Sequence, residues 1–92
     1  MNKFTKYQMA GEVESTTAAK LLYLLLLDTA DAKGEITIPQ KQVGAALGMS
    51  RNTVSRNFHR LREQGLIEVI AQHDIYRGQL PNKYVVREGQ TA

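Results

Sequence analysis

The sequence predicts a mainly α-helical domain with a small antiparallel sheet, built in the order helix, strand, helix, helix, strand, strand. Three observations predict this fold class. Apolar residues recur at helical spacing in three segments, Gly or Pro stands beside the ends of those segments, and short runs rich in Ile and Val lie between or after them. A length of 92 residues with 42% hydrophobic and 23% charged side chains fits one soluble globular domain.

The composition excludes several classes of protein. The chain has no Cys, which rules out a disulfide scaffold and Cys-ligated zinc and is typical of a cytoplasmic protein. The longest apolar run, residues 21–27, is far shorter than the roughly 20 residues that span a membrane. We see no signal peptide, no clustered metal ligands, no base beside a Ser and no phosphate-binding loop, so we expect no membrane partner, metal, cofactor or enzymatic activity.

The first helix follows an N-terminal arm. Residues 1–14 carry scattered apolar side chains without a clear period, which predicts an extended arm or a short strand. Ser15 or Thr16 supplies an N-cap oxygen for a helix that runs to about Ala32 and is ended by Gly34. Since residues 21–27 are apolar on all sides, this helix is either central or partly at a partner interface.

A short strand and a short helix come next. Residues 35–38 are rich in β-branched side chains and predict a strand. Pro39 presets the start of a helix over Gln40–Leu47. Gly44 leaves room for a second helix to cross closely, and Gly48 tolerates the positive φ of a tight turn.

The third predicted helix covers residues 51–64, with Ser50 as its N-cap and Gly65 after its end. A stripe of apolar residues spaced four and three apart marks its buried face: Val54, Phe58 and Leu61.

The remaining residues predict a β-hairpin and a tail. Residues 66–71 and 83–87 form its strands, and residues 73–82, with Gly78 and Pro81, form a loop. We therefore divide the chain into an arm at 1–14, a domain at 15–88 and a disordered tail at 89–92.

The positive charge is concentrated in one stretch. Residues 36–62 contain five Lys or Arg and no Asp or Glu, whereas residues 1–35 and 63–92 each carry a net charge of −1. A local basic field of this kind suits a polyanion such as a phosphate backbone.

The basic stretch includes a helix that could read bases. At 100° per residue, Asn52, Arg56 and His59 lie opposite the apolar stripe of helix 51–64, and Arg51 leaves from its first turn. Arg pairs bidentately with guanine and Asn with adenine, so a helix with these donors suits the major groove.

These residues also carry a resemblance to a known family. Residues 38–67 resemble the winged helix-turn-helix (three-helix core plus β-wing) of the cyclic-AMP receptor protein/FNR class of bacterial regulators. The stretch Ser-Arg-Asn-Thr-Val-Ser-Arg at residues 50–56 is similar to the start of that family's recognition helix. The resemblance implies base-reading roles for Arg51, Asn52 and Arg56, and phosphate contacts for Ser50 and Thr53.

The chain departs from this family in three ways. Pro39 replaces the usual Thr cap, Asn57 occupies a position that is normally apolar, and no cyclic-nucleotide domain precedes the motif in these residues. The effector input of that family therefore cannot be carried over to this chain, and no small-molecule effector is evident from the sequence.

A second resemblance covers residues 19–28, 65–68 and 80–84. They are similar to the winged-helix N-terminal domain of plasmid replication initiators of Gram-positive bacteria, and to small phage and plasmid helix-turn-helix proteins. This resemblance leaves replication open beside transcription.

The sequence thus predicts a sequence-specific double-stranded DNA-binding protein, a bacterial, plasmid or phage transcriptional regulator that acts as a homodimer. A replication or partition accessory protein and a protein-interaction module are the alternatives. We expect the wing residues Arg77 and Lys83 to lie around the hairpin turn and contact phosphates. The further candidate phosphate contacts are Lys41, His59 and Arg60.

Overall fold

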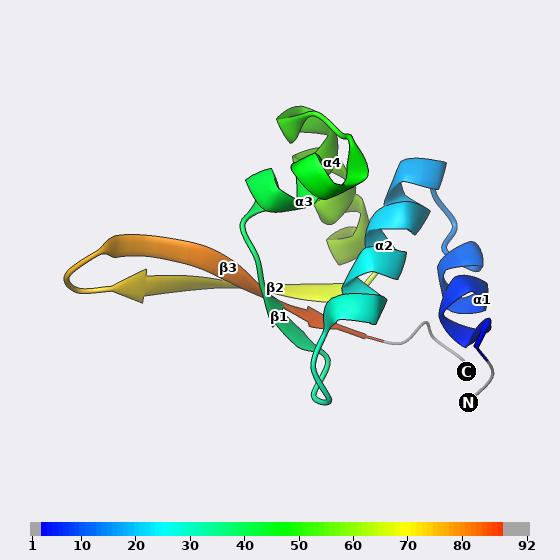
Figure 1. Ribbon diagram of the computed structural model, residues 1–92, viewed down its shortest axis with the longest axis horizontal. Coiled ribbons are helices and arrows are strands. Elements are labelled where there is room, and N and C mark those ends of the chain that lie inside the picture. The colour runs from blue at the N-terminus through cyan, green and yellow to red at the C-terminus, as the bar shows by residue number, and fades with distance from the viewer. Residues whose placement is uncertain (1–2, 88–92) are drawn as a thin grey trace.

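The computed structural model describes residues 3–87 as helices packed on one side of a small sheet from which a long hairpin projects (Figure 1). The described elements are α1 (Thr5–Gly11), α2 (Thr17–Thr29), β1 (Glu35–Thr37), α3 (Gln40–Leu47), α4 (Arg51–Glu63), β2 (Ile67–Asp74) and β3 (Gly78–Val86). The three strands form an antiparallel sheet in the order β1-β3-β2. The predicted fold class is confirmed, and the tail at 89–92 lies outside the described residues.

The N-terminal arm is a helix, so the prediction of an extended arm or a strand was wrong. α1 packs against α2 and buries Ala10, and Val13 in the following turn is also buried. Seven residues are too few for a stable isolated helix, so α1 depends on this packing for its stability.

α2 begins as the sequence predicts but ends earlier. The Thr16 hydroxyl accepts a hydrogen bond from the Ala19 amide and caps the first turn. The helix stops at Thr29, and Gly34 belongs instead to a turn in which its amide bonds the Asp31 carbonyl. A side chain at Gly34 would lie 2.9 Å from the Val86 carbonyl oxygen, so Gly34 serves close packing against β3.

α3 and α4 form the predicted helix-turn-helix. Gly48 ends α3 with a φ of 66°, and Ser50 caps α4 by accepting from the Thr53 amide at 3.2 Å. A Cβ atom on Gly44 would stand 2.8 Å from the Met49 carbonyl oxygen and 3.3 Å from Val54 Cγ2. The small residue expected at this crossing is therefore required by the geometry.

The hairpin is longer than predicted. β2 and β3 pair out to Asp74 opposite Gly78, so most of the expected loop at 73–82 is strand. Pro81 and Asn82 together oppose Ala71 in a bulge, and β1 ends opposite Lys83. The missing N–H of Pro81 therefore costs no ladder bond, which is how a Pro is accommodated in a strand.

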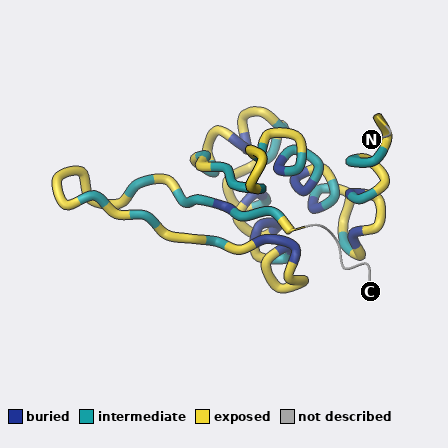
Figure 2. The backbone as a smooth tube through the Cα atoms, turned by 90° about the horizontal axis from the view of Figure 1, so that it is seen from below, coloured by how far each residue is buried: buried dark blue, intermediate teal, exposed yellow. Residues whose placement is uncertain are grey.

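The core lies where α2, α4 and the proximal sheet meet. Tyr84 of β3 stacks on Phe58 of α4 with ring centroids 4.3 Å apart, and the side chains of Leu22 and Leu26 of α2 are fully buried. Figure 2 shows the contrast, because buried residues gather under the helices whereas the distal hairpin is mostly exposed. The core holds α4 on the sheet and leaves the hairpin free to reach outward.

Candidate nucleic-acid interface

The outer face of α4 carries the predicted base-reading residues. Val54, Phe58 and Leu61 are buried as expected, and the predicted outward residues Arg51, Asn52 and Arg56 are exposed. Among residues 3–87, no hydrogen bond or ion pair engages the side chains of these three residues. α4 thus presents a guanidinium, an amide and a second guanidinium that can all pair with an external ligand.

The start of α4 is organised by its cap. The Ser50 hydroxyl lies 2.9 Å from the Thr53 hydroxyl and accepts from the Thr53 amide. Both oxygens therefore lie beside the first turn of the helix, where the dipole favours an anion. His59, farther along the exposed face, lies 3.6 Å from the Glu63 carboxylate at i+4.

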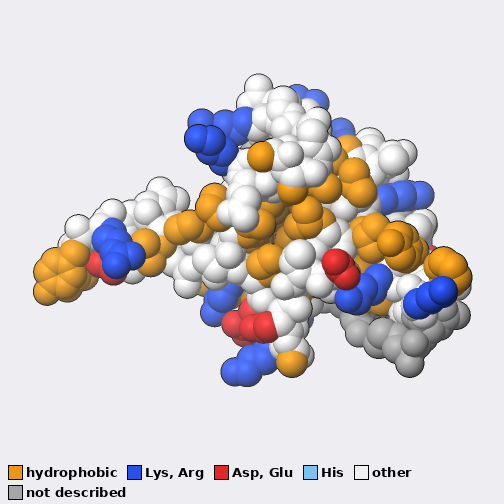
Figure 3. All heavy atoms as spheres, in the orientation of Figure 1, with side chains coloured by type: hydrophobic (Ala, Val, Ile, Leu, Met, Phe, Trp, Pro, Cys, Tyr) orange, Lys and Arg blue, Asp and Glu red, His pale blue; other side chains and the backbone are white. Residues whose placement is uncertain are grey.

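A groove separates this helix start from the hairpin. It has a volume of about 750 Å³, and Lys41 and Arg51 stand on one side while residues 79–82 of β3 stand on the other. In Figure 3 basic side chains lie over the α3–α4 end of the molecule and again on the distal hairpin, with the hollow between them. The groove is therefore open to solvent, with cations on its α3–α4 side and neutral residues on its hairpin side.

Arg60 faces a different part of the molecule. Its guanidinium donates to the Thr16 hydroxyl and to Asn57 Oδ1, both at 3.3 Å. Asn57 is only 2% exposed, although its type is polar, and its Nδ2 donates to the Thr53 carbonyl at 2.8 Å. Arg60 is thus held by the junction between α2 and α4, which sequence reasoning did not foresee.

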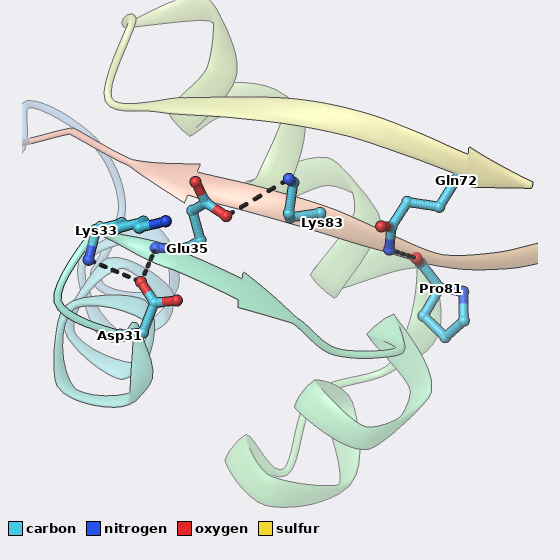
Figure 4. A network of polar contacts seen from close by, with 6 residues as sticks. All are labelled: Asp31, Lys33, Glu35, Gln72, Pro81 and Lys83. Carbon is cyan, nitrogen blue, oxygen red and sulfur yellow. Dashed lines mark hydrogen bonds and ion pairs between the residues drawn. The ribbon is translucent and has the colours of Figure 1, made fainter.

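The two wing cations also differ from each other. Lys83 does not lie around the hairpin turn, so its predicted placement was wrong: it pairs with Thr37 and Ile70 in the sheet, and its ammonium lies 3.4 Å from Glu35 (Figure 4). Arg77 lies at the turn as predicted and is exposed. The prediction for Lys83 failed because the hairpin is longer than the sequence suggested.

The hairpin tip carries two apolar residues that sequence reasoning passed over. Ile75 is 91% and Tyr76 90% exposed. Their signal in the sequence is an apolar pair placed between Asp74 and Gly78, where a turn would ordinarily be polar.

Other kinds of site find no support in the described part of the chain. Residues 3–87 contain no group of three or more His, Cys, Asp or Glu that could hold a metal ion. None of the described helices is both long enough and apolar enough to cross a membrane.

Comparison with known proteins identifies the family. Residues 17–77 match the Crp-like helix-turn-helix domain. The chain belongs to the Crp-like helix-turn-helix family. The match begins at the first residue of α2 and ends at the hairpin turn, so α1 precedes it. A comparison with curated proteins finds no significant match.

Membership of this family indicates the general role of the surface around α4. A Crp-like helix-turn-helix domain is a DNA-binding domain, and α4 occupies the place of its second helix, which enters the major groove in this motif. The resemblance of residues 38–67 to this family is confirmed.

Proposed function

We propose that this protein is a sequence-specific double-stranded DNA-binding regulator of transcription, of bacterial, plasmid or phage origin, which acts in the cytoplasm and inserts α4 into the major groove. One observation carries the proposal: Arg51, Asn52 and Arg56 are exposed together on α4, within a stretch that contains no acidic residue. Duplex DNA offers the acceptors and the negative charge that such a surface lacks.

The three residues have separate roles in this proposal. The guanidinium groups of Arg51 and Arg56 read guanine O6 and N7, and the Asn52 amide reads adenine N6 and N7. Because Arg51 also lines the groove beside the hairpin, it reads the edge of the half-site nearest the wing.

The proposed phosphate contacts surround this reading surface. Ser50 and Thr53 supply hydroxyls at the start of α4, Lys41 of α3 supplies an ammonium on the same side of the groove as Arg51, and His59 and Arg77 lie farther out. Arg60 and Lys83 can contribute only by sharing the bonds they already make to Asn57 and Glu35. We therefore give these two the smaller share of the phosphate interaction.

A homodimer would supply the second half-site. Between α1 and α2 lies a second groove of about 670 Å³, walled by Tyr7, Leu21, Leu24, Leu25 and Leu47. Its rim holds the ion pair between Lys6 and Asp28, 3.2 Å apart. A surface with apolar walls and charges of both signs can be self-complementary about a two-fold axis, and it shares no lining residue with the groove beside α4.

The test is selection of bound sequences from a random duplex pool with the full chain. We expect one enriched motif with inverted half-sites about 10 base pairs apart. Enrichment of origin-type direct repeats would instead favour a replication accessory protein. No retardation of any duplex at low salt would overturn DNA binding and leave the protein-interaction module.

A further inference from the structure

Exposed apolar side chains gather at two places that lie far apart on the molecule. Among the large hydrophobic residues exposed in the described chain, Ile75 and Tyr76 cap the hairpin, and Tyr7 and Leu21 wall the groove between α1 and α2. Figure 3 shows hydrophobic side chains at the end of the hairpin and again where α1 meets α2. Large apolar side chains held in water mark a contact surface, so both places call for a partner.

The hairpin tip, residues 74–77, is an apolar knob on a fixed turn. The Asp74 carboxylate accepts from the amides of Tyr76 at 2.7 Å and Arg77 at 3.2 Å, and these bonds hold the turn in place. Asp74 and Arg77 give the tip one charge of each sign, so the tip has no net charge. An apolar surface with balanced charges therefore fits the tip better than a polyanion does.

The groove between α1 and α2 has these properties. It has a volume of about 670 Å³, and its apolar wall includes Leu21, Leu24 and Leu25. Its rim also carries one charge of each sign, the Lys6 ammonium and the Asp28 carboxylate, 3.2 Å apart. Because the Asp28 side chain is 71% exposed, a second cation can approach this carboxylate from solvent.

The hairpin tip and this groove lie at opposite ends of the long axis of the molecule (Figure 1). The hairpin projects about 17 Å beyond the end of β1, at about 3.4 Å per residue, and it points away from α1. The tip cannot reach the groove of its own chain, so a second copy must supply the contact. Two chains laid side by side in opposite directions bring each tip to the other's groove, and a two-fold axis closes such a pair.

We propose that the α1–α2 groove of each chain holds the hairpin tip of a second copy, an inference that rests on the homodimer proposed above. Tyr76 and Ile75 enter the space between α1 and α2 and cover Leu21. The contact occurs twice in the dimer, so both tips and both grooves are covered at once. α4 lines neither surface, so both reading helices stay open to DNA.

The charges of the two surfaces pair in the same contact. Arg77 faces Asp28 of the partner subunit, and Asp74 faces Lys6 of the partner subunit. If the tip entered the groove the other way round, like charges would meet, so these pairs favour one orientation. In a paired chain Arg77 is occupied, and the phosphate contact proposed for it is left to unpaired chains.

Cysteine cross-linking of the full chain without DNA tests the contact directly. Since the chain has no Cys, a protein with Tyr76→Cys can be mixed with a tagged protein that carries Leu21→Cys, and a thiol oxidant added. We expect a disulfide-linked mixed dimer, because a disulfide forms only where the two Cα atoms lie within about 7 Å. Gln8→Cys, at an exposed position of α1 outside the groove, replaces Leu21→Cys as the control and should give little mixed product.

Sedimentation of variants without DNA tests the apolar and the charged parts separately. The double variant Ile75→Ser, Tyr76→Ser should have the mass of one chain at a concentration where the wild type is a dimer. Arg77→Glu should weaken the dimer roughly tenfold or more, and Asp28→Arg in the same chain should restore most of the loss, because opposite charges meet again. His73→Ala, an exposed change on the same hairpin, should leave the dimer unchanged.

The outcomes separate this contact from the proposals on which it rests. If the wild type sediments as one chain, the homodimer and this contact fail together, whereas DNA binding is tested independently by the duplex selection. If the wild type is a dimer and the tip variants are dimers too, or the mixed disulfide does not exceed the control, the homodimer stands and the tip contact is overturned. A mass that keeps growing with concentration would indicate a head-to-tail chain and would overturn the closed pair.

Discussion

The Thr16 hydroxyl donates to Asn57 Oδ1 at 3.2 Å and joins the first turn of α2 to the middle of α4. The same hydroxyl accepts from the Ala19 amide at 3.2 Å, so the cap of one helix is also a tether for the other. Asn57 thereby satisfies its buried polar groups at a position that is apolar in the family it resembles. The tether joins α4, the second helix of the helix-turn-helix, to the start of α2.

We expect Asn57→Ala to lower the free energy of unfolding by about 1–3 kcal/mol, because it removes a buried amide that bonds both the Thr16 hydroxyl and the Arg60 guanidinium. Thr16→Ala should cost about 1 kcal/mol through the lost cap. Since the two residues share a bond, their effects in a urea-unfolding double-mutant cycle should not add. Thr16→Ser keeps the hydroxyl and is the control. If the changes in unfolding free energy of the two single variants add in the double variant, the bond between Thr16 and Asn57 contributes nothing to stability.

A second prediction concerns the reading face of α4. Arg51→Ala, Asn52→Ala and Arg56→Ala should each weaken binding to the selected site by about 1–3 kcal/mol and relax preference at one base pair. Binding to scrambled duplex should change less. Titrations of both duplexes measure the difference.

Arg62→Ala is the matched control, because it removes one exposed positive charge from the far end of the same helix. Its loss of affinity should be small and equal for both duplexes. If the three reading variants behave like Arg62→Ala, α4 does not read bases.

The crossing of α3 and α4 gives a third prediction. Gly44→Ala places a Cβ 2.8 Å from the Met49 carbonyl oxygen, and the two helices must move apart, at a cost of about 1–3 kcal/mol. Gly11→Ala is the control, since its Cβ would meet nothing within 4 Å. Calorimetric unfolding should give a lower melting temperature for Gly44→Ala than for Gly11→Ala. Equal melting temperatures would show that α3 and α4 can move apart without a loss of stability.

Much of the helix-turn-helix could be predicted because its signals are local. The Ser50 cap, the turn at Gly48 and the spacing of Val54 and Phe58 depend on neighbours within a few residues in the chain. Rules of helix geometry therefore suffice to place α4 and its exposed face.

The elements that sequence reasoning missed depend on distant partners. α1 is stabilised by packing on α2, and its seven residues carry no periodic signal of their own. The bulge at Pro81 and the end of β1 at Thr37 together make β3 longer than its Gly and Pro content suggests. Arg60 and Lys83 are engaged by residues 44 and 48 positions away in the sequence, which no local pattern reveals.

A fourth prediction concerns acid stability. The Asp31 carboxylate accepts from the Glu35 amide at 2.9 Å and the Lys33 amide at 2.8 Å, and these bonds hold the pKa of Asp31 below its ordinary value (Figure 4). A depressed folded-state pKa gives stability that is present above the unfolded pKa and is lost as the pH falls through the folded pKa.

Asp31→Asn keeps an acceptor oxygen but cannot titrate, so its stability should fall less steeply with acid than that of the wild type. A carboxyl-carbon NMR titration of the wild type measures the pKa directly. A midpoint at or above the ordinary aspartate value would contradict the assignment.

The last prediction concerns the oligomeric state. One reading helix covers only a few base pairs, so a second half-site is needed for discrimination among genomic sequences. Leu21 lies on the rim of the groove between α1 and α2 and is exposed, so Leu21→Glu introduces a charge there without disturbing the core. Gln8→Glu adds the same charge to an exposed position of α1 that does not line the groove.

Sedimentation at micromolar concentration measures the mass of each species. The wild type and the Gln8→Glu variant should have a mass above the 10.3 kDa of one chain, and the Leu21→Glu variant should have the mass of one chain. The Leu21→Glu protein should then bind single half-sites with unchanged base preference but lose its preference for the paired site, because α4 remains intact while the two-fold contact is gone. A wild-type species of 10.3 kDa that binds DNA with one-to-one stoichiometry would instead mean that α1 only covers its own domain, and the homodimer would be excluded.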